Sequence, residues 1–306
     1  MTSKPIAVGI DFSHGCRAAL LEAMRMAAFR QVPVHAVHVI DTLLSVDLAQ
    51  AAAAFSPDLH RELIDGAHAQ WRRFRDGIPG ALDISFDVRL DHRGTGVVSF
   101  ARDHGAGVLV IGAFGDKRPD VGFGTVATTC VRHAAMDVLV VRDTQASSFR
   151  CVAACIDFSP SSRAVMERAV SMASQDNAAL HVVHVWDAMW AGLSTTSGMD
   201  GETAATFQLI REQLREAAQQ RLVDFSQSEK AALEYLKPKF HLHEQSGHRS
   251  GIVSFAQTVG ADLLVLGRRG RSSVRDLLLG STAEKALRET ECSTLVVAPP
   301  ESVTQK

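Results

Sequence analysis

The chain has 306 residues, of which 46% are apolar and 22% are charged, and its formal net charge is −2. This balance is typical of a globular protein with substantial buried cores and argues against a mainly disordered chain. The near-neutral charge gives no electrostatic reason to expect nucleic-acid binding, and no apolar run approaches the roughly 18 residues of a membrane span.

The first half of the chain alternates short apolar runs with longer mixed segments. The apolar runs are rich in β-branched residues, as parallel strands covered on both faces are. They are Ile6–Ile10 and residues 34–40, 108–111 and 138–141. Ile84, Phe86, Val88 and Leu90 instead alternate with polar residues, which predicts a half-exposed strand at a sheet edge. Alternating strand and helix patterns predict an open parallel sheet with right-handed crossovers.

The second half contains a long helical pattern and another set of apolar runs. Residues 202–237 are predicted to be helical because apolar residues recur there at helical spacing. This stripe consists of Phe207, Ile210, Leu214, Ala218 and Phe225. Residues 283–289 form a shorter helical pattern that follows a glycine-rich segment.

Five sequence blocks of the first half recur in the same order in the second half. Two pairs are offset by 146 residues: 9–13 (GIDFS) with 155–159 (CIDFS), and 37–41 (VHVID) with 183–187 (VHVWD). Further pairs are 96–101 (GVVSFA) with 251–256 (GIVSFA), 108–112 (VLVIG) with 263–267 (LLVLG), and 138–141 (VLVV) with 294–297 (TLVV). The repeat predicts two tandem α/β domains, residues 1–146 and residues 147–306.

The glycine-rich segment of the second copy has features of a phosphate-binding loop. Gly267 and Gly270 follow an apolar run, and Gly280, Ser281 and Thr282 come nine residues later. Glycines let the backbone approach a ligand closely, and their N–H groups can form an anion-binding nest. The hydroxyl groups and the start of the following helix add donors for phosphate.

The charges and helix signals of this segment support the same interpretation. The loop contains four arginines and one acidic residue, so it carries three surplus positive charges. These residues are Arg268, Arg269, Arg271, Arg275 and Asp276. Ser281 is expected to cap the following helix, and Glu284 to complete a capping box. A Gly-x-x-Gly pair alone would indicate only a glycine-rich connection with a solvated basic face. The third glycine and the hydroxyls favour phosphate binding.

The pattern Gly267-x2-Gly270-x9-Gly280-Ser281 resembles the Gly-2x-Gly-9x-Gly-[Ser/Thr] signature of ATP-binding universal stress proteins. The resemblance covers nearly the whole chain in two copies. It implies tandem five-stranded parallel sheets of the adenine-nucleotide alpha-hydrolase-like fold and a cytoplasmic stress-response protein. It also implies binding of ATP, with ADP, AMP and an accompanying Mg²⁺ left open, through nine residues of the second domain. They are Ile156, Asp157, Val185, Gly267, Arg268, Gly270, Gly280, Ser281 and Thr282.

Two of these positions also have a role that follows from the family. An Asp after the first strand holds the adenosine part, and Asp157 matches it. Val185 matches a stretch that lines the adenine pocket. Asp157 also precedes Ser159-Pro160, a suitable helix cap and first-turn pair, so its alternative role is that of a loop or capping residue.

The family also implies how the two copies associate. The last strand of a universal stress protein commonly pairs across a two-fold axis. Residues 138–141 and 295–297 are therefore expected to pair within the chain as an intramolecular pseudo-dimer, which removes two exposed sheet edges. A homodimer of whole chains and a regulatory protein partner are left open.

The first copy departs from the signature. Its corresponding positions are Asp11, Val39, Gly112, Gly115, Gly124 and Thr125. Only eight residues separate Gly115 from Gly124, and Asp116 and Asp120 cancel the charges of Lys117 and Arg118. Thr128 stands where a capping-box acid would be. We expect the first domain to bind nucleotide weakly or not at all, or to prefer a ligand with fewer charges.

Other function classes find less support in the sequence. His241, His243 and His248 are the nearest candidate metal ligands, but histidines on an edge strand are more often only solvated. His38 and His184 recur at the same place and are expected to pack or form hydrogen bonds. No P-loop or nucleophile elbow is present. The alternatives are a metal- or apolar-ligand-binding stress protein without ATP dependence, or a slow ATPase without a dedicated catalytic centre.

Two observations bear on the compartment. Residues 1–11 lack the basic-then-apolar pattern of a signal peptide. The five cysteines form no disulfide framework, and Cys151 and Cys155 are expected to be thiols in or near the core. We therefore expect reduced cysteines and a cytoplasmic location.

Overall fold

The computed structural model describes residues 4–41, 57–78, 80, 83–115, 124–142, 148–187, 201–229, 235–245, 247–270 and 279–300. The chain divides into two compact units. The first comprises Met1–Ser147 with Ser293–Leu295, and the second comprises Ser148–Cys292 with Val296–Lys306.

The first unit alternates strands and helices, as the sequence predicts. In chain order its elements are β1 (Ile6–Ile10), α1 (His14–Arg30), β2 (Val34–Asp41), α3 (Pro57–Asp76), β3 (Ile84–Asp91), α4 (Arg93–Asp103), β4 (Val108–Gly112), α5 (Thr125–His133) and β5 (Asp137–Val141). The strand order is β3-β2-β1-β4-β5, and the neighbouring strands are parallel.

The second copy repeats this plan. Its elements are β6 (Cys151–Cys155), α6 (Ser161–Asp176), β7 (Ala179–Asp187), α7 (Gly201–Ser228), β8 (Lys239–Gln245), α9 (His248–Val259), β9 (Leu263–Gly267), α10 (Ser281–Glu289) and β10 (Ser293–Val297). The strand order is β10-β9-β6-β7-β8. The α/β fold with two tandem sets of five strands is therefore confirmed.

The burial of the strands follows their place in this order. All five residues of β5 and the first four residues of β4 and β9 are buried. By contrast, β3 alternates half-buried and exposed positions over most of its length, as its hydrophobic alternation predicts. It pairs with β2 alone and so forms the outer edge of its unit.

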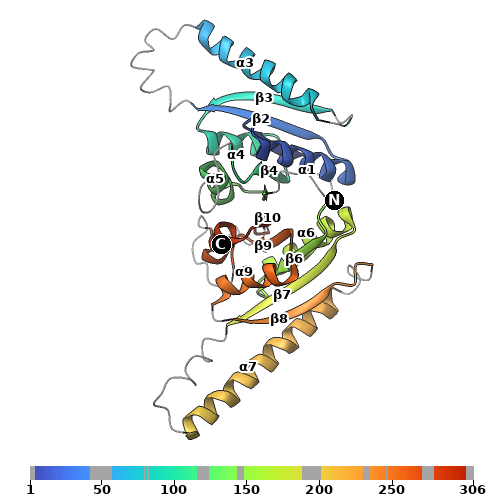
Figure 1. Ribbon diagram of the computed structural model, residues 1–306, viewed down its shortest axis with the longest axis vertical. Helices are drawn as coiled ribbons and strands as arrows, with labels where there is room; N and C mark the ends of the chain where they lie inside the picture. The colour runs from blue at the N-terminus through green and yellow to red at the C-terminus, as the bar shows by residue number, and fades with distance from the viewer. Residues whose placement is uncertain are drawn as a thin grey trace. The chain divides into compact units, whose positions relative to one another are not determined.

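The crossovers place helices on both faces of each unit. In the first unit α1 packs on one face while α4 and α5 lie together on the other, and α9 and α10 form the matching pair in the second unit (Figure 1). The connections change direction between β1 and β4 and between β6 and β9. These switch points are where doubly wound sheets bind ligands, at the carboxyl ends of the strands.

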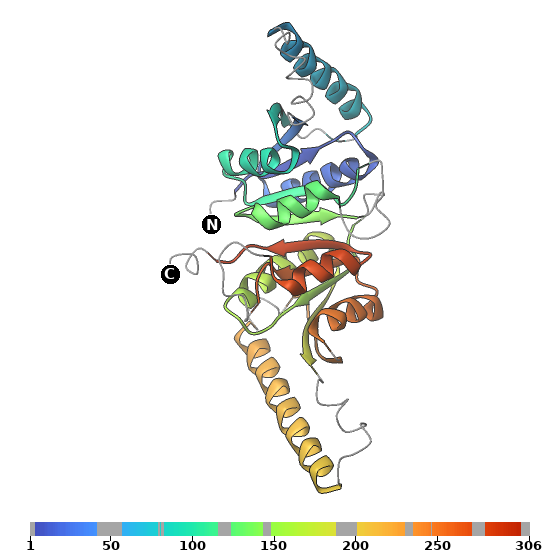
Figure 2. The same cartoon turned by 90° about the vertical axis from the view of Figure 1, so that its left-hand side faces the viewer.

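Helix α7 differs from the sequence prediction at its carboxyl end. It ends at Ser228, and Lys237 has a φ of 44°, outside the right-handed helical region. Its start runs beyond the strands of its unit in both views (Figures 1 and 2). Ile210 and Leu214 are 43% and 46% exposed, so part of the predicted apolar stripe is not buried in the core. None of the described helices is long and apolar enough to span a membrane.

Both copies contain a tight turn directly after their first strand. Phe12 and Phe158 stand at equivalent positions and have φ values of 63° and 58°, a conformation that is uncommon for residues other than glycine. His38 Nδ1 lies 2.8 Å from the Ile10 carbonyl oxygen in one copy. The equivalent bond of the other copy, from His184 to Ile156, is 2.9 Å long. The hydrogen-bonding role predicted for these two histidines is confirmed.

Candidate functional site

The second unit contains a cavity of about 850 Å³ at the carboxyl ends of β6, β7 and β9. This volume lies in the usual range of small-molecule sites. All nine residues predicted for the second domain line the cavity: Ile156, Asp157, Val185, Gly267, Arg268, Gly270, Gly280, Ser281 and Thr282. The fold thus brings together residues that are up to 126 positions apart in the sequence, from Ile156 to Thr282.

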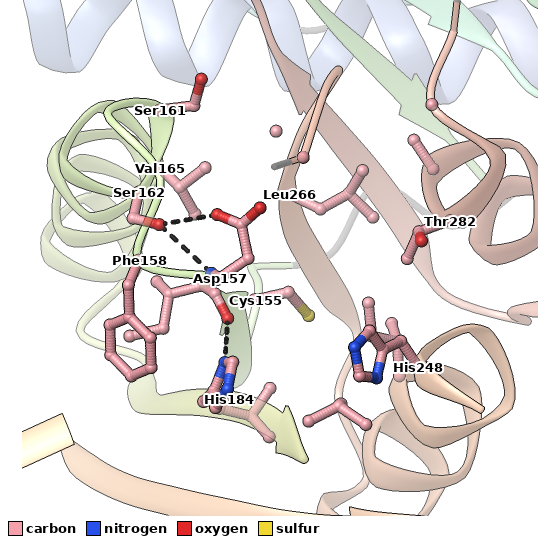
Figure 3. Close-up of a pocket in the computed structure, with 18 of the residues that line it drawn as sticks. Cys155, Asp157, Phe158, Ser161, Ser162, Val165, His184, His248, Leu266 and Thr282 are labelled. Carbon is pink, nitrogen blue, oxygen red and sulfur yellow. Dashed lines mark hydrogen bonds between the residues drawn. The ribbon is translucent and has the colours of Figure 1, made fainter. Parts of the chain in front are cut away.

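The carboxylate of Asp157 is held in a defined orientation inside this cavity. Its Oδ1 accepts hydrogen bonds from the Ser159 backbone N–H at 3.0 Å and from the Ser162 hydroxyl at 3.1 Å. An added Cβ on Gly270 would lie 2.9 Å from Asp157 Oδ2. Figure 3 shows the carboxylate directed into the space between α6 and Leu266 of β9.

The described residues of the glycine-rich loop line the cavity next to Asp157. The Gly280 N–H donates to the Arg268 carbonyl at 2.9 Å, and an added Cβ on Gly280 would lie 3.0 Å from that same oxygen. The requirement for glycine at Gly270 and Gly280 is therefore steric. Arg268 also lines the cavity and contributes a positive charge there. It is only 7% exposed. Arg271, Arg275 and Asp276 lie outside the described residues.

The N-cap of α10 lies one residue before the predicted one. Gly280 is the N-cap, Ser281 is the first helical residue, and no side-chain hydrogen bond caps the helix, so the predicted Ser281 cap and capping box are wrong. Glu284 N–H donates to the Gly280 carbonyl instead. The hydroxyls of Ser281 and Thr282 lie at the first turn, where backbone N–H groups and the helix dipole favour an anion.

A similar one-residue difference occurs at α6. Pro160, not Ser159, is the N-cap of this helix, and it offers no side-chain cap. The Ser159 N–H is used to hold Asp157. The turn that was predicted to start the helix therefore serves to orient the carboxylate.

The rest of the cavity is lined by aromatic and apolar residues that sequence analysis did not single out for this role. The Phe158 ring packs against His184 with a centroid distance of 4.4 Å, and the Arg221 guanidinium carbon lies 5.6 Å from the centre of that ring. Burial lowers the pKa of His184, so its imidazole is neutral near pH 7. Leu214 and Arg221 come from α7 and Ile252 from α9, and only the tertiary fold brings these helices to the site.

The first unit has the same positions with different local packing. An added Cβ on Gly15 would lie 2.5 Å from the Phe114 carbonyl oxygen, and one on Gly112 would lie 2.8 Å from the Gly15 carbonyl carbon. The loop after β4 therefore lies directly on the start of α1. In the second copy Ser161 stands at the position of Gly15 and lines the cavity.

The other predicted positions of the first copy follow the same plan. Asp11 lies near Gly115, whose added Cβ would be 3.0 Å from Asp11 Oδ2. Val39 is buried. Gly124 is the N-cap of α5 and Thr125 its first residue, so Thr125 does not cap this helix. Thr128 bonds back to the Gly124 carbonyl. Residues 116–123, including the charges that make this loop neutral, lie outside the described residues.

The three histidines considered as metal ligands occupy separate places. His241 lies 3.1 Å from a ring nitrogen of His181, and His243 Nε2 lies 2.9 Å from the Ser254 hydroxyl. His248 lines the cavity instead. Among the described residues, no group of three or more His, Cys, Asp or Glu side chains is placed to hold a metal ion. None of the five cysteines forms a disulfide bond.

Comparison with known proteins settles the family. The model of the universal stress protein family matches residues 2–142 and, a second time, residues 148–298. The chain belongs to the universal stress protein family. It is of the tandem type, with two such domains in one chain.

Relatives of this universal stress protein cover one or both domains. Universal stress protein Rv2623 of Mycobacterium tuberculosis is 26% identical over 321 residues, which span 99% of this chain and 98% of that protein. Universal stress protein MJ0531 of Methanocaldococcus jannaschii is 30% identical over 135 residues, or 44% of this chain and 73% of the relative.

Solved structures support the fold over the whole length. The crystal structure of PA1789 from Pseudomonas aeruginosa, a protein described as functionally unknown, has a TM-score of 0.64 and 18% identity, and the match covers 97% of this chain and 93% of that one. A universal stress protein from Archaeoglobus fulgidus matches with a TM-score of 0.55 and 15% identity, over 98% of this chain and 100% of that structure. At these identities the likeness concerns the fold alone.

Proposed function

We propose that the second domain binds an adenine nucleotide, with ATP as the preferred ligand, and that the chain acts as a nucleotide-dependent regulator in a cytoplasmic stress response. The observation that carries this proposal is one cavity that is lined by a carboxylate, by two glycines of the adjacent loop and by the start of a helix. Asp157 is suited to accept hydrogen bonds from ribose hydroxyls. Gly270, Gly280 and the start of α10 are suited to the phosphates.

The fit to a nucleotide rests on steric space and charge. Side chains at Gly270 and Gly280 would clash with Asp157 Oδ2 and with the Arg268 carbonyl oxygen, so glycine at both positions lets the loop lie close to the carboxylate. Arg268 at the cavity wall favours an anion. Mg²⁺, if it accompanies the nucleotide, would be held mainly by the phosphates, because the described residues offer no metal-ligand cluster of their own.

The regulatory step would be a change at the loop between Gly267 and Gly280. Phosphate bound there would stabilise one loop conformation, and a partner protein could distinguish the loaded surface from the empty one. Pairing of the two copies within the chain stays a prediction. Association of two chains and a regulatory protein partner are left open.

The first domain is proposed to bind nucleotide weakly or not at all. The Phe114 carbonyl lies over the start of α1, next to Gly15, whereas the residue at the Gly15 position in the second domain, Ser161, lines the cavity. Phe114 also stands at the position of Arg269, so the first loop lacks that cation. We therefore expect one nucleotide per chain.

Two measurements test the proposal. Mass spectrometry of ligand released from freshly purified protein should detect ATP, ADP or AMP. Isothermal titration of ligand-free protein should show one site per chain for ATP, with weaker binding of ADP and AMP. No detectable nucleotide in both experiments would reject nucleotide binding, and two equal sites would reject the difference between the domains.

The same preparations separate the alternatives. A metal or an apolar ligand released without nucleotide would favour a binding module that does not depend on ATP. Phosphate release would indicate a slow ATPase only if it falls when Asp157 or Gly270 is replaced, because a contaminating enzyme would be insensitive to both changes.

A further inference from the structure

The hydroxyl of Ser162 contacts both the backbone and the side chain of Asp157. It accepts a hydrogen bond from the Asp157 N–H at 3.2 Å and donates one to Asp157 Oδ1 at 3.1 Å. Figure 3 shows both bonds as dashed lines that converge on this hydroxyl. Ser162 is only 2% exposed, so water cannot readily replace it. One buried side chain thus fixes the carboxylate relative to its own backbone.

The consequence of this arrangement is a defined role for each carboxylate oxygen. Oδ1 is bonded within the turn, by Ser162 and by the Ser159 N–H. Oδ2 is the oxygen on the side of Gly270, in the cavity. Without the Ser162 hydroxyl, Oδ1 would lose the side-chain hydrogen bond that restrains rotation about the Cβ–Cγ bond and would keep the one from the Ser159 N–H. The direction of Oδ2 would then be less well defined.

In the first domain the main side-chain donor to the equivalent carboxylate is a different serine, Ser13. Asp11 Oδ1 accepts from the N–H and the hydroxyl of Ser13, at 3.0 and 2.5 Å. The same Ser13 hydroxyl caps α1 by accepting the Cys16 N–H at 3.2 Å. Cys16 stands at the position of Ser162, and its thiol is placed to hydrogen-bond to Asp11. A thiol is a weaker donor than a hydroxyl, so the strong side-chain donor at this position is found in the second domain.

We propose that Ser162 is a positioning residue for recognition of the ribose. It holds Asp157 so that Oδ2 accepts hydrogen bonds from the 2′ and 3′ hydroxyls of a nucleotide. This inference rests on the proposed nucleotide-binding function and adds a second residue to the recognition of the sugar. Ser162 acts through Asp157 and need not touch the ligand.

The test compares ATP with 2′,3′-dideoxy-ATP, which has the same base and phosphates but lacks both hydroxyls. In isothermal titrations the unmodified chain should bind ATP at least about tenfold more tightly, as expected for a hydrogen bond to a charged group. Ser162→Ala should reduce this preference to about threefold or less by weakening ATP binding. Its affinity for dideoxy-ATP should stay within about twofold of the unmodified value.

A matched control and a second variant make the result specific. Ser171→Ala removes a hydroxyl from the same helix, away from the cavity lining, and should keep the full preference for ATP. Ser162→Cys introduces the residue of the first domain with little change in volume. It should lose the preference as Ser162→Ala does, and it serves if the alanine variant does not fold.

The outcomes distinguish this inference from the proposed function. If the unmodified chain binds neither nucleotide, the proposed function fails. If it binds both equally, or if the Ser162 variants keep the preference for ATP, the positioning role is overturned while nucleotide binding stands. An equal loss of affinity for both ligands in the Ser162 variants would also overturn it, because that result indicates general damage to the site.

Discussion

Replacement of Gly270 by alanine should weaken ATP binding through a contact that the structure defines. The new Cβ would lie 2.9 Å from Asp157 Oδ2, whereas ordinary van der Waals contact begins at 3.4 Å. The loop or the carboxylate must therefore shift by roughly 0.5 Å, and small displacements of positioned groups have large effects. Gly270 is not among the glycines with positive φ, so alanine itself should fit the backbone.

The magnitude follows from the interaction that the shift disturbs. A hydrogen bond to a charged group contributes about 1.5–3 kcal/mol. Its loss would raise the dissociation constant of ATP about 10- to 100-fold. The melting temperature should change by only a few degrees, because one new methyl group in a loop disturbs little of the buried core.

Isothermal titration with ATP provides the assay, and the first domain offers a matched control. In Gly115→Ala the added Cβ would lie 3.0 Å from Asp11 Oδ2, nearly the same steric change. This variant should bind ATP like the unmodified chain. Unchanged affinity in Gly270→Ala would refute the reasoning, and weaker binding in Gly115→Ala alone would place the nucleotide in the first domain.

Three further predictions concern stability and thiol chemistry. Gly66 lies in α3 with nothing within 4 Å of an added Cβ, so Gly66→Ala should raise the free energy of unfolding by about 0.5–1 kcal/mol in denaturant titrations; a decrease would contradict the open position. Burial lowers the pKa of His184, so the unfolded state binds more protons below about pH 6.5, and stability should fall as the pH drops. His184→Asn should show a shallower fall between pH 6.5 and 5.5, and an identical pH profile would speak against this contribution. Burial raises the pKa of Cys16 and Cys130 to about 12, so both should resist a thiol reagent at pH 8 until the chain is unfolded; rapid labelling of either in the native protein, followed by peptide mass spectrometry, would contradict their burial.

The fold could be predicted from the sequence because hydrophobic periodicity reports on burial and repetition reports on the number of domains. The alternation at residues 84–90 predicted the half-exposed strand β3, and the offset blocks predicted two equivalent sets of strands. Helix boundaries were less accurate. Gly280 and Pro160 occupy the cap positions where Ser281 and Ser159 were expected, because cap preferences are weak and a backbone hydrogen bond can replace the side chain.

The candidate site was predictable only where a motif marks it. The spacing of the glycines and the position of Asp157 identified the loop and the carboxylate. Ser162 was missed because a serine in the first turn of a helix is common, and its counterpart Cys16 hides it from comparison of the repeats. Arg221 was missed because helical spacing shows which face of α7 is apolar but not which strand ends lie opposite it.

The turn at Phe12 and Phe158 suggests which part of the domain can be exchanged. Both copies adopt its strained backbone and both stabilise it with an imidazole–carbonyl hydrogen bond, although their glycine-rich loops differ in length and sequence. The turn is therefore part of the scaffold, and ligand recognition depends on the segments that surround it. A chimaera that carries residues 267–282 in place of residues 112–126, together with Gly15→Ser and Cys16→Ser, would test whether binding can be transferred with these short segments. Gene duplication would then have supplied a second copy of the scaffold, and that copy could lose or change its ligand while it kept the fold.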